Sequence, residues 1–201
     1  KSTIIPYIGR RGGVLDMFVL THPHTDHVGG AASVFRALHP ATFVDGGFPG
    51  PAASYRDALA TAREKRIRWT RAHPGDSVFV DGVAIRFLAP DSAWTASLVD
   101  PNLASVVTLL EVGDVRMLLM GDAEQAEEAW LLAHEASALH ADILKVGHHG
   151  SQTSSSEPFT TNLIVQLLPS WNWSTIKSFP RIRTLGIVSI KHFNSNAFDI
   201  A

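Results

Sequence analysis

The stretch that decides the fold is THPHTDHVGG, residues 21–30, where three histidines and one aspartate fall within six positions. It directly follows LDMFVL, residues 15–20, an apolar run with the length of a buried strand. Imidazole and carboxylate groups suit zinc, iron or manganese, and two such ions about 3.5 to 4 Å apart form a hydrolytic site. A polar loop with surface histidines is the alternative, but this density of ligand types at a strand end favours a metal site.

The spacing within this stretch divides the four side chains. In an extended backbone, alternate side chains share one side. We therefore expect His22, His24 and Asp26 to project together and His27 to point elsewhere, so that the four groups serve two metal positions. The two glycines that follow allow a tight turn into the next helix.

A second segment, Gly-Asp-Ala-Glu at residues 121–124, also follows an apolar strand and begins a helix. Asp122 could cap that helix, with its carboxylate accepting a hydrogen bond from a backbone amide. Beside the first stretch, a carboxylate at a strand end is also the ligand that bridges two metal ions. The combination of the two segments favours the metal role.

A third segment, KVGHHGS at residues 145–151, places two histidines between glycines at the end of another apolar run. The glycines leave the backbone free to bring an imidazole to a metal. We interpret His148 as the ligand, because it leaves the strand first, and His149 as a supporting or proton-transfer group. The alternative for either histidine is a structural role in the core, with its ring hydrogen-bonded and no metal bound.

The order of hydrophobic runs, turns and helical patterns indicates an α/β domain. The first three predicted strands alternate with two helices, and later strands form hairpins with turns at residues 81–82 and 113–114. Such an order implies a sheet-rich layer between helices. The predicted strands are 15–20, 42–44, 67–70, 77–80, 83–88, 105–112, 115–120 and 142–146, and the predicted helices are 31–38, 51–65 and 124–139.

Composition excludes several classes of protein. A chain of 201 residues is the size of one domain, and its formal charge of -2 provides no overall electrostatic footprint for a polyanion. The absence of cysteine removes disulfide scaffolds, thiolate zinc sites and cysteine nucleophiles. Any bound metal must therefore use histidine and carboxylate.

The end of the chain differs in composition from the rest. Residues 1–156 contain 22 alanines and one asparagine, whereas residues 157–201 contain two alanines and four asparagines. We therefore expect a coherent domain over 1–156 and a divergent or poorly ordered tail over 157–201. The alternative is a genuine extension with strands at 163–168 and 184–190. The first residue, Lys1, indicates a piece of a longer product.

Three segments together resemble a known family: LTHPHTDHVGG (20–30), SVVTLLEVGDVRMLLMGDAE (105–124) and DILKVGHHGSQTSSS (142–156). They resemble the metallo-β-lactamase superfamily and, within it, the hydrolase domain of the ComEC family of DNA-internalisation competence proteins. The resemblance runs from about Ile4 to Ser156. It implies an α/β fold, a metallo-β-lactamase-like αββα sandwich, incomplete here because it lacks the family's N-terminal strands and ends in an aberrant tail.

The resemblance also implies a ligand set and roles. The bound group would be two divalent metal ions, zinc first, with manganese or iron as alternatives. A metal-bound hydroxide would attack the substrate, Asp26 would help to orient or deprotonate it, and His149 would move protons. By position, His22 and His24 would hold the first metal, Asp26, His27 and His148 the second, and Asp122 would bridge them.

One departure from the family concerns the first metal. Many members carry a further metal-binding histidine between the first loop and the bridging aspartate. Here that interval holds only His39, expected at a helix end, and His73, expected in a turn. The first metal would then lack a protein ligand.

The function implied by the resemblance is hydrolysis of DNA phosphodiesters during DNA uptake, with single-stranded DNA as the substrate. The alternatives are a truncated, non-catalytic remnant that only binds metal, and a hydrolase of a small ester, lactone or lactam. No run of about 20 apolar residues predicts a membrane span. A ComEC-like parent would place the domain outside the cytoplasmic membrane, whereas stand-alone relatives are soluble in the cytoplasm. The oligomeric state is left open.

Overall fold

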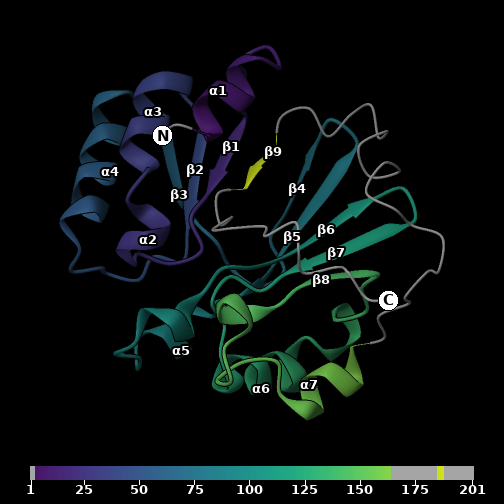
Figure 1. Ribbon diagram of the computed structural model, residues 1–201. Helices are drawn as coiled ribbons and strands as arrows, with labels where there is room; N and C mark the ends of the chain where they lie inside the picture. The colour runs from purple at the N-terminus through teal and green to yellow at the C-terminus, as the bar shows by residue number, and fades with distance from the viewer. Residues whose placement is uncertain (1–2, 164–184, 188–201) are drawn as a thin grey trace.

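Two β-sheets face each other, and helices cover both outer faces (Figure 1). The computed structural model describes residues 3–163 and 185–187. One sheet has the strand order β3-β2-β1-β9 and the other β4-β5-β6-β7-β8. The predicted αββα sandwich of the α/β class is therefore confirmed.

The first sheet is parallel throughout. Its first three strands alternate with two crossover helices, because parallel neighbours need a connection that returns to the starting edge. The predicted alternation of strands and helices in this half is confirmed. The strands are β1 (Met17–Val19), β2 (Thr42–Asp45), β3 (Arg68–Arg71) and β9 (Leu185–Ile187), and the helices of this half are α1 (Ile4–Gly9), α2 (Thr25–Val28), α3 (Ala31–Leu38) and α4 (Ala53–Glu64).

The second sheet begins with antiparallel pairs. Tight turns join β4 to β5 and β6 to β7, as predicted, and β8 then pairs parallel to β7 after a helical crossover. The strands are β4 (Ser77–Val80), β5 (Val83–Ala89), β6 (Val107–Val112), β7 (Val115–Leu119) and β8 (Ile143–Lys145). The helices are α5 (Ser92–Thr95), α6 (Gln125–His134) and α7 (Glu157–Asn162), with 3-10 turns η1 (Pro101–Ala104), η2 (Ala136–Ala138) and η3 (Gly147–Gly150).

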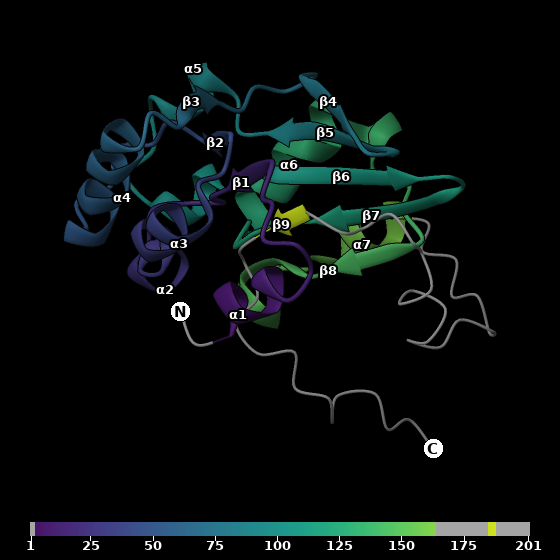
Figure 2. The ribbon, with the colours of Figure 1, turned by 90° about the horizontal axis from the view of Figure 1, so that it is seen from above.

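Three apolar layers hold the sandwich together. Between the first sheet and its helices, the rings of Phe18, Phe35 and Phe43 lie 5.0 to 6.0 Å apart in edge or tilted contacts. Between the sheets, residues such as Ile85 and Phe87 are buried. A third layer joins the second sheet to α6 and α7. Viewed from above, α2, α3 and α4 lie at the side of the first sheet, and α6 and α7 lie behind the strands of the second sheet (Figure 2).

The helix predicted over 124–139 is shorter than expected. Helix α6 ends at His134, and residues 136–138 form the 3-10 turn η2. The apolar residues Ala138 and Leu139 are fully buried in the third layer, so burial rather than helix propensity decides the path of the chain here.

The packed core continues beyond the boundary predicted at residue 156. Helix α7 brings Phe159 and Leu163 into the layer between the second sheet and α6. Strand β9 lies within the alternative strand at 184–190, and the other residues of the predicted tail lie outside the described part of the chain. Ahead of β1, residues 3–16 hold helix α1 and no strand, as the resemblance implied. None of the described helices has the length and hydropathy needed to cross a membrane.

Candidate metal centre

The histidines and aspartates singled out in the sequence meet where three strands end. The loop after β1 supplies His22 and His27, the loop after β7 supplies Asp122, and the turn after β8 supplies His149. Because β1 belongs to one sheet and β7 and β8 to the other, the centre joins the two halves of the sandwich. Two groups of ligand atoms form there: His22, His27 and Asp122, and Asp26, His27 and His149.

Thr21 fixes two of the imidazoles. Its buried Oγ1 lies 3.1 Å from Nδ1 of His22 and 3.2 Å from Nδ1 of His27. Both rings therefore present their Nε2 atoms to the other side, where Asp122 lies. A hydrogen bond to one ring nitrogen sets the orientation of a histidine whose other nitrogen binds metal.

Asp122 stands at the middle of the centre. Its Oδ2 atom lies 3.0 Å from Nε2 of His27, 3.2 Å from Nε2 of His149 and 3.9 Å from Nε2 of His22. Its backbone N–H donates to Ser105 Oγ, which holds the loop. Burial alone would raise the pKa of Asp122, but the hydrogen bond and charge of His27, with His22 and His149, lower that pKa to about 2. The carboxylate is therefore ionised at neutral pH.

The backbone of the first loop is not extended throughout, and the expected division of its side chains is wrong. From Thr25 the chain forms helix α2, with His24 as its N-cap. The helical turn brings His27 back beneath the loop, so that it belongs to both ligand groups instead of pointing elsewhere. Asp26 lies at the exposed rim, where its Oδ2 atom is 3.6 Å from Nε2 of His27 and 4.0 Å from Nε2 of His149.

His24 borders the centre, next to His22. His24 Nδ1 lies 3.0 Å from Nε2 of His22. Burial, together with the neighbouring His27, lowers the pKa of His22 to about 3, so His22 is neutral at pH 7 and has a lone pair available for a metal. The interval between the loops supplies no further histidine to either group, since His39 ends α3 and His73 lies in a turn beside Ser92.

His148 and His149 face different partners. His149 is the one beside Asp122, whereas His148 Nδ1 lies 2.7 Å from Oε1 of Glu124 and 3.2 Å from Oγ1 of Thr153. Both residues have left-handed backbone angles, with φ of 41° and 55°. Such angles cost a residue other than glycine about 1 to 3 kcal/mol and are found where the surroundings impose them, often at functional sites.

Lys145 is a part of the site that the sequence analysis did not single out. Its Nζ donates to the carbonyl of Gly121 at 2.6 Å and lies 3.9 Å from Oδ1 of Asp122. Burial lowers the pKa of Lys145, and the charge of Asp122 opposes that shift. The sequence carries no pattern that distinguishes this lysine, since its role depends on contacts with residues 24 and 23 positions earlier in the chain.

Comparison with known proteins places the chain in a family. The model of the metallo-beta-lactamase superfamily matches residues 5–161. The chain belongs to the metallo-beta-lactamase superfamily. The matched residues include every member of both ligand groups.

Three curated proteins that match this chain have names that refer to competence or recombination. The chain is 30% identical over 179 residues to Recombination protein 2 of Haemophilus influenzae, covering 88% of this chain and 20% of that protein. It is 30% identical over 170 residues to ComE operon protein 3 of Bacillus subtilis, covering 81% and 21%. It is 29% identical over 160 residues to Competence protein ComA of Neisseria gonorrhoeae, covering 79% and 20%. The chain thus spans about a fifth of the length of these relatives.

The residues at the centre fit a pair of divalent ions. The donors are imidazole nitrogens and carboxylate oxygens, a set that suits zinc, manganese or iron. Among the described residues, the buried Oδ1 atom of Asp122 has no hydrogen-bond partner, and such an oxygen is costly to bury unless something pairs with it. A metal ion would satisfy it.

Proposed function

We propose that this chain is a metal-dependent hydrolase that cleaves phosphodiester bonds of single-stranded DNA. The observation that carries the proposal is the position of His27, which belongs to both ligand groups and joins them into one cluster. Asp122 lies against both groups, with its Oδ2 atom 3.0 Å from Nε2 of His27 and 3.2 Å from Nε2 of His149. Two adjacent ligand groups are the arrangement that two-metal hydrolases use on phosphate esters.

The proposed ligand assignment combines the family resemblance with the distances at the centre. We propose that His22 and His24 hold one ion and that Asp26 and His27 hold the other, with Asp122 between them. His149 takes the place that the sequence analysis gave to His148, because His149 is the histidine beside Asp122. Two bound ions would neutralise the charge of a phosphate group and lower the pKa of a coordinated water molecule.

The protein's own groups then orient the reactants. The side chain of Asp26 is 40% exposed. From the rim of the site, its carboxylate can accept a hydrogen bond from the attacking water. Lys145 holds the Gly121 carbonyl and so fixes the loop that carries Asp122. His148, paired with Glu124, borders the site from the side of α6 and can exchange a proton with the leaving oxygen.

The names of the relatives support DNA as the substrate. Two of them are named for competence and one for recombination, and all three match over more than three quarters of this chain. The formal charge of -2 supplies no general attraction to a polyanion. The bound ions are therefore expected to provide much of the charge that a phosphate group meets.

The proposal can be tested with the purified chain, first stripped of metal and then loaded with zinc or manganese. A labelled single-stranded oligonucleotide should be cut by the loaded protein and not by the stripped one. His24→Ala and Asp122→Ala should each reduce the rate by about 100-fold or more, because each removes a proposed ligand. His73→Ala, a histidine in a turn outside both ligand groups, is the matched control and should retain full activity.

The same assay separates the alternatives. A folded protein that binds less than one equivalent of metal would contradict the two-metal proposal and favour a non-catalytic remnant. Cleavage of DNA that survives both alanine substitutions would show that another site is responsible. Metal-dependent turnover of a β-lactam, a thioester or a lactone in the absence of DNA cleavage would favour a small ester or lactam as the substrate.

A further inference from the structure

A groove borders the metal loop. It has a volume of about 520 Å³, within the range of small-ligand sites. One wall is the metal loop itself, through Pro23, His24 and Thr25. The other walls are the segment after β2 and the segment between α5 and η1. The residues of these walls are Phe48, Pro49, Pro51, Ala52, Leu98, Val99 and Pro101.

The lining of this groove is apolar and lacks full charges. None of its ten residues is a lysine, arginine, aspartate or glutamate. Val99, at the edge of the groove, is 95% exposed and offers apolar surface to a ligand. His24 and Thr25, at the metal loop, are the polar residues of the lining, and away from them the groove suits an uncharged, mainly apolar group.

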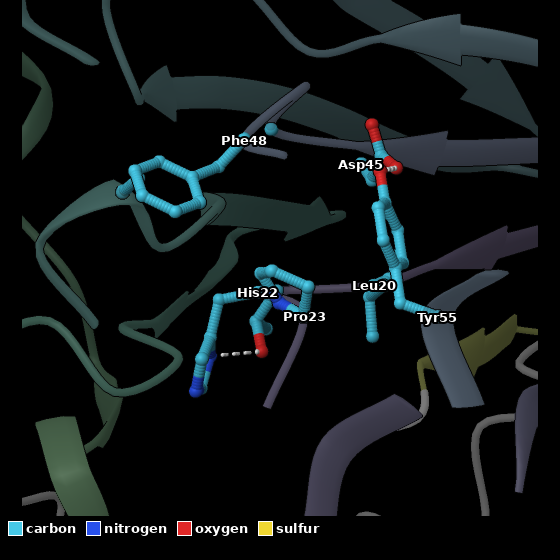
Figure 3. A pocket seen from close by; sticks show the side chains of 9 residues that line it. Leu20, His22, Pro23, Asp45, Phe48 and Tyr55 are labelled. Carbon is cyan, nitrogen blue, oxygen red and sulfur yellow. Dashed lines mark hydrogen bonds between the residues drawn. The ribbon is translucent and has the colours of Figure 1, made fainter. Parts of the chain in front are cut away.

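The groove is also held in shape by buried contacts behind it. The small cavity on the inner side of Pro23 and Phe48 is shown in Figure 3, with Asp45 and Tyr55 among its lining residues. Asp45 accepts hydrogen bonds from the Tyr55 hydroxyl at 2.7 Å and from the backbone N–H of Gly47 at 2.9 Å. It thereby ties the segment after β2 to helix α4.

A single arginine connects this segment to the opposite wall. Arg71 donates to Oγ1 of Thr95, in the helix that precedes Leu98, at 2.6 Å. Its side chain also lies against Gly47 so closely that a Cβ there would be 2.6 Å from the Arg71 Nε atom. Both walls of the groove are thus positioned before any ligand binds, which lowers the entropic cost of binding.

We propose that this groove binds the nucleobase next to the phosphodiester bond that is cleaved. The proposal rests on the proposed function and adds the part of the substrate that the metal centre does not bind. His24 lines the groove and also contacts His22, so a phosphate at the metal centre would place an adjoining base at the groove. Proline rings and Phe48 offer flat apolar surface to a base, and stacking of this kind tolerates any sequence.

The test compares two ligands that differ only by the base, thymidine 5′-monophosphate and 2-deoxyribose 5-phosphate. Their dissociation constants for the zinc-loaded chain can be measured by NMR titration. We expect the nucleotide to bind about tenfold more tightly, since stacking of one base contributes about 1 to 3 kcal/mol. Val99→Asp should remove most of this difference, and Val99→Tyr, which enlarges the apolar wall, should increase it.

The matched control is Val14→Asp, which places the same charge on another exposed valine outside the groove. It should keep the preference for the nucleotide. Equal binding of the two ligands by the unaltered chain, an unchanged preference in Val99→Asp, or a loss in Val14→Asp would overturn the proposal. A preference that depends on Val99, in a chain that does not cleave the dinucleotide TpT, would support the groove and contradict the proposed function.

Discussion

His148 and His149 are neighbours in the chain, and only their side-chain directions distinguish them. The left-handed backbone at both positions turns His149 toward Asp122 and His148 toward Glu124. We predict that His149→Ala lowers the affinity for zinc by about 100-fold and that His148→Ala lowers it by about tenfold or less, since support of a ligand is worth less than the ligand itself. Calorimetric titration of metal-free protein measures both, and the reverse order would contradict the assignment.

The types of the candidate ligands could be predicted from the sequence, but their grouping could not. Histidine and aspartate at strand ends are visible in the chain, whereas the helical turn that brings His27 beneath the loop is set by packing. Thr21 and Lys145 act through contacts with distant groups, the two imidazoles and the Gly121 carbonyl. A threonine or lysine next to a motif carries no distinguishing pattern of its own.

Two loops of the site approach each other more closely than any side chain permits. A Cβ at Gly147 would lie 2.2 Å from the backbone oxygen of Ala123, the residue after Asp122. We predict that Gly147→Ala forces these loops apart, lowers the free energy of unfolding by about 1 to 3 kcal/mol and weakens zinc binding. Gly30→Ala is the matched control, because a Cβ there meets no atom within 4 Å. Denaturant unfolding and zinc titration should separate the two variants; equal behaviour would refute the steric argument.

Helix α6 buries two adjacent glutamates in different ways. Glu128 accepts hydrogen bonds from the backbone N–H groups of Ser155 and Ser156. Glu127 is fully buried, and burial raises its pKa well above 4.5, with the backbone of Ser105 opposing the shift. Above about pH 4.5 the unfolded state therefore releases the proton of this carboxyl while the folded state keeps it. The folded state loses up to about 1.4 kcal/mol of stability for each pH unit as the pH rises.

Replacement of Glu127 by its neutral isostere should remove this loss. We predict that Glu127→Gln is more stable than the unaltered chain at pH 8 and that the difference shrinks toward pH 5. Glu128→Gln should lower stability at pH 8, because it weakens two hydrogen bonds to a charged acceptor. Urea unfolding from pH 5 to pH 8 checks both variants. A difference for Glu127→Gln that does not change with pH would show that the buried carboxyl is ionised.

The α/β class and most of the strands could be predicted from local signals, because turns and alternating helices mark the strands, whereas the two-sheet αββα sandwich was implied by the family resemblance. The hairpin turns at residues 81–82 and 113–114 and the alternation in the first half are local signals. The ends of α6 and α7 depend on burial. Residue composition and hydrophobic periodicity therefore predicted these boundaries less well. The shift in composition at residue 156 did not coincide with the edge of the core, because Phe159 and Leu163 still pack against α6.

The position of the metal centre between the sheets links metal binding to the stability of the whole molecule. His22 and His27 follow a strand of one sheet, whereas Asp122 and His149 follow strands of the other. Metal bound by the proposed ligands would therefore hold both halves together and would pair with the buried Oδ1 atom of Asp122, which has no hydrogen-bond partner among the described residues. Unfolding must separate the ligands, so metal that binds the folded state alone adds to the free energy of unfolding.

At 100 times its dissociation constant, zinc should add about 2.7 kcal/mol to the free energy of unfolding. For a domain of this size, that corresponds to a rise in Tm of roughly 5 to 10 °C over the chelator-treated protein. Differential scanning calorimetry measures the shift, and Asp122→Asn should abolish most of it by weakening the carboxylate that lies between His27 and His149. If zinc binds stoichiometrically and Tm does not change, zinc binds the unfolded chain as tightly as the folded one, which contradicts a centre that only the assembled sandwich forms.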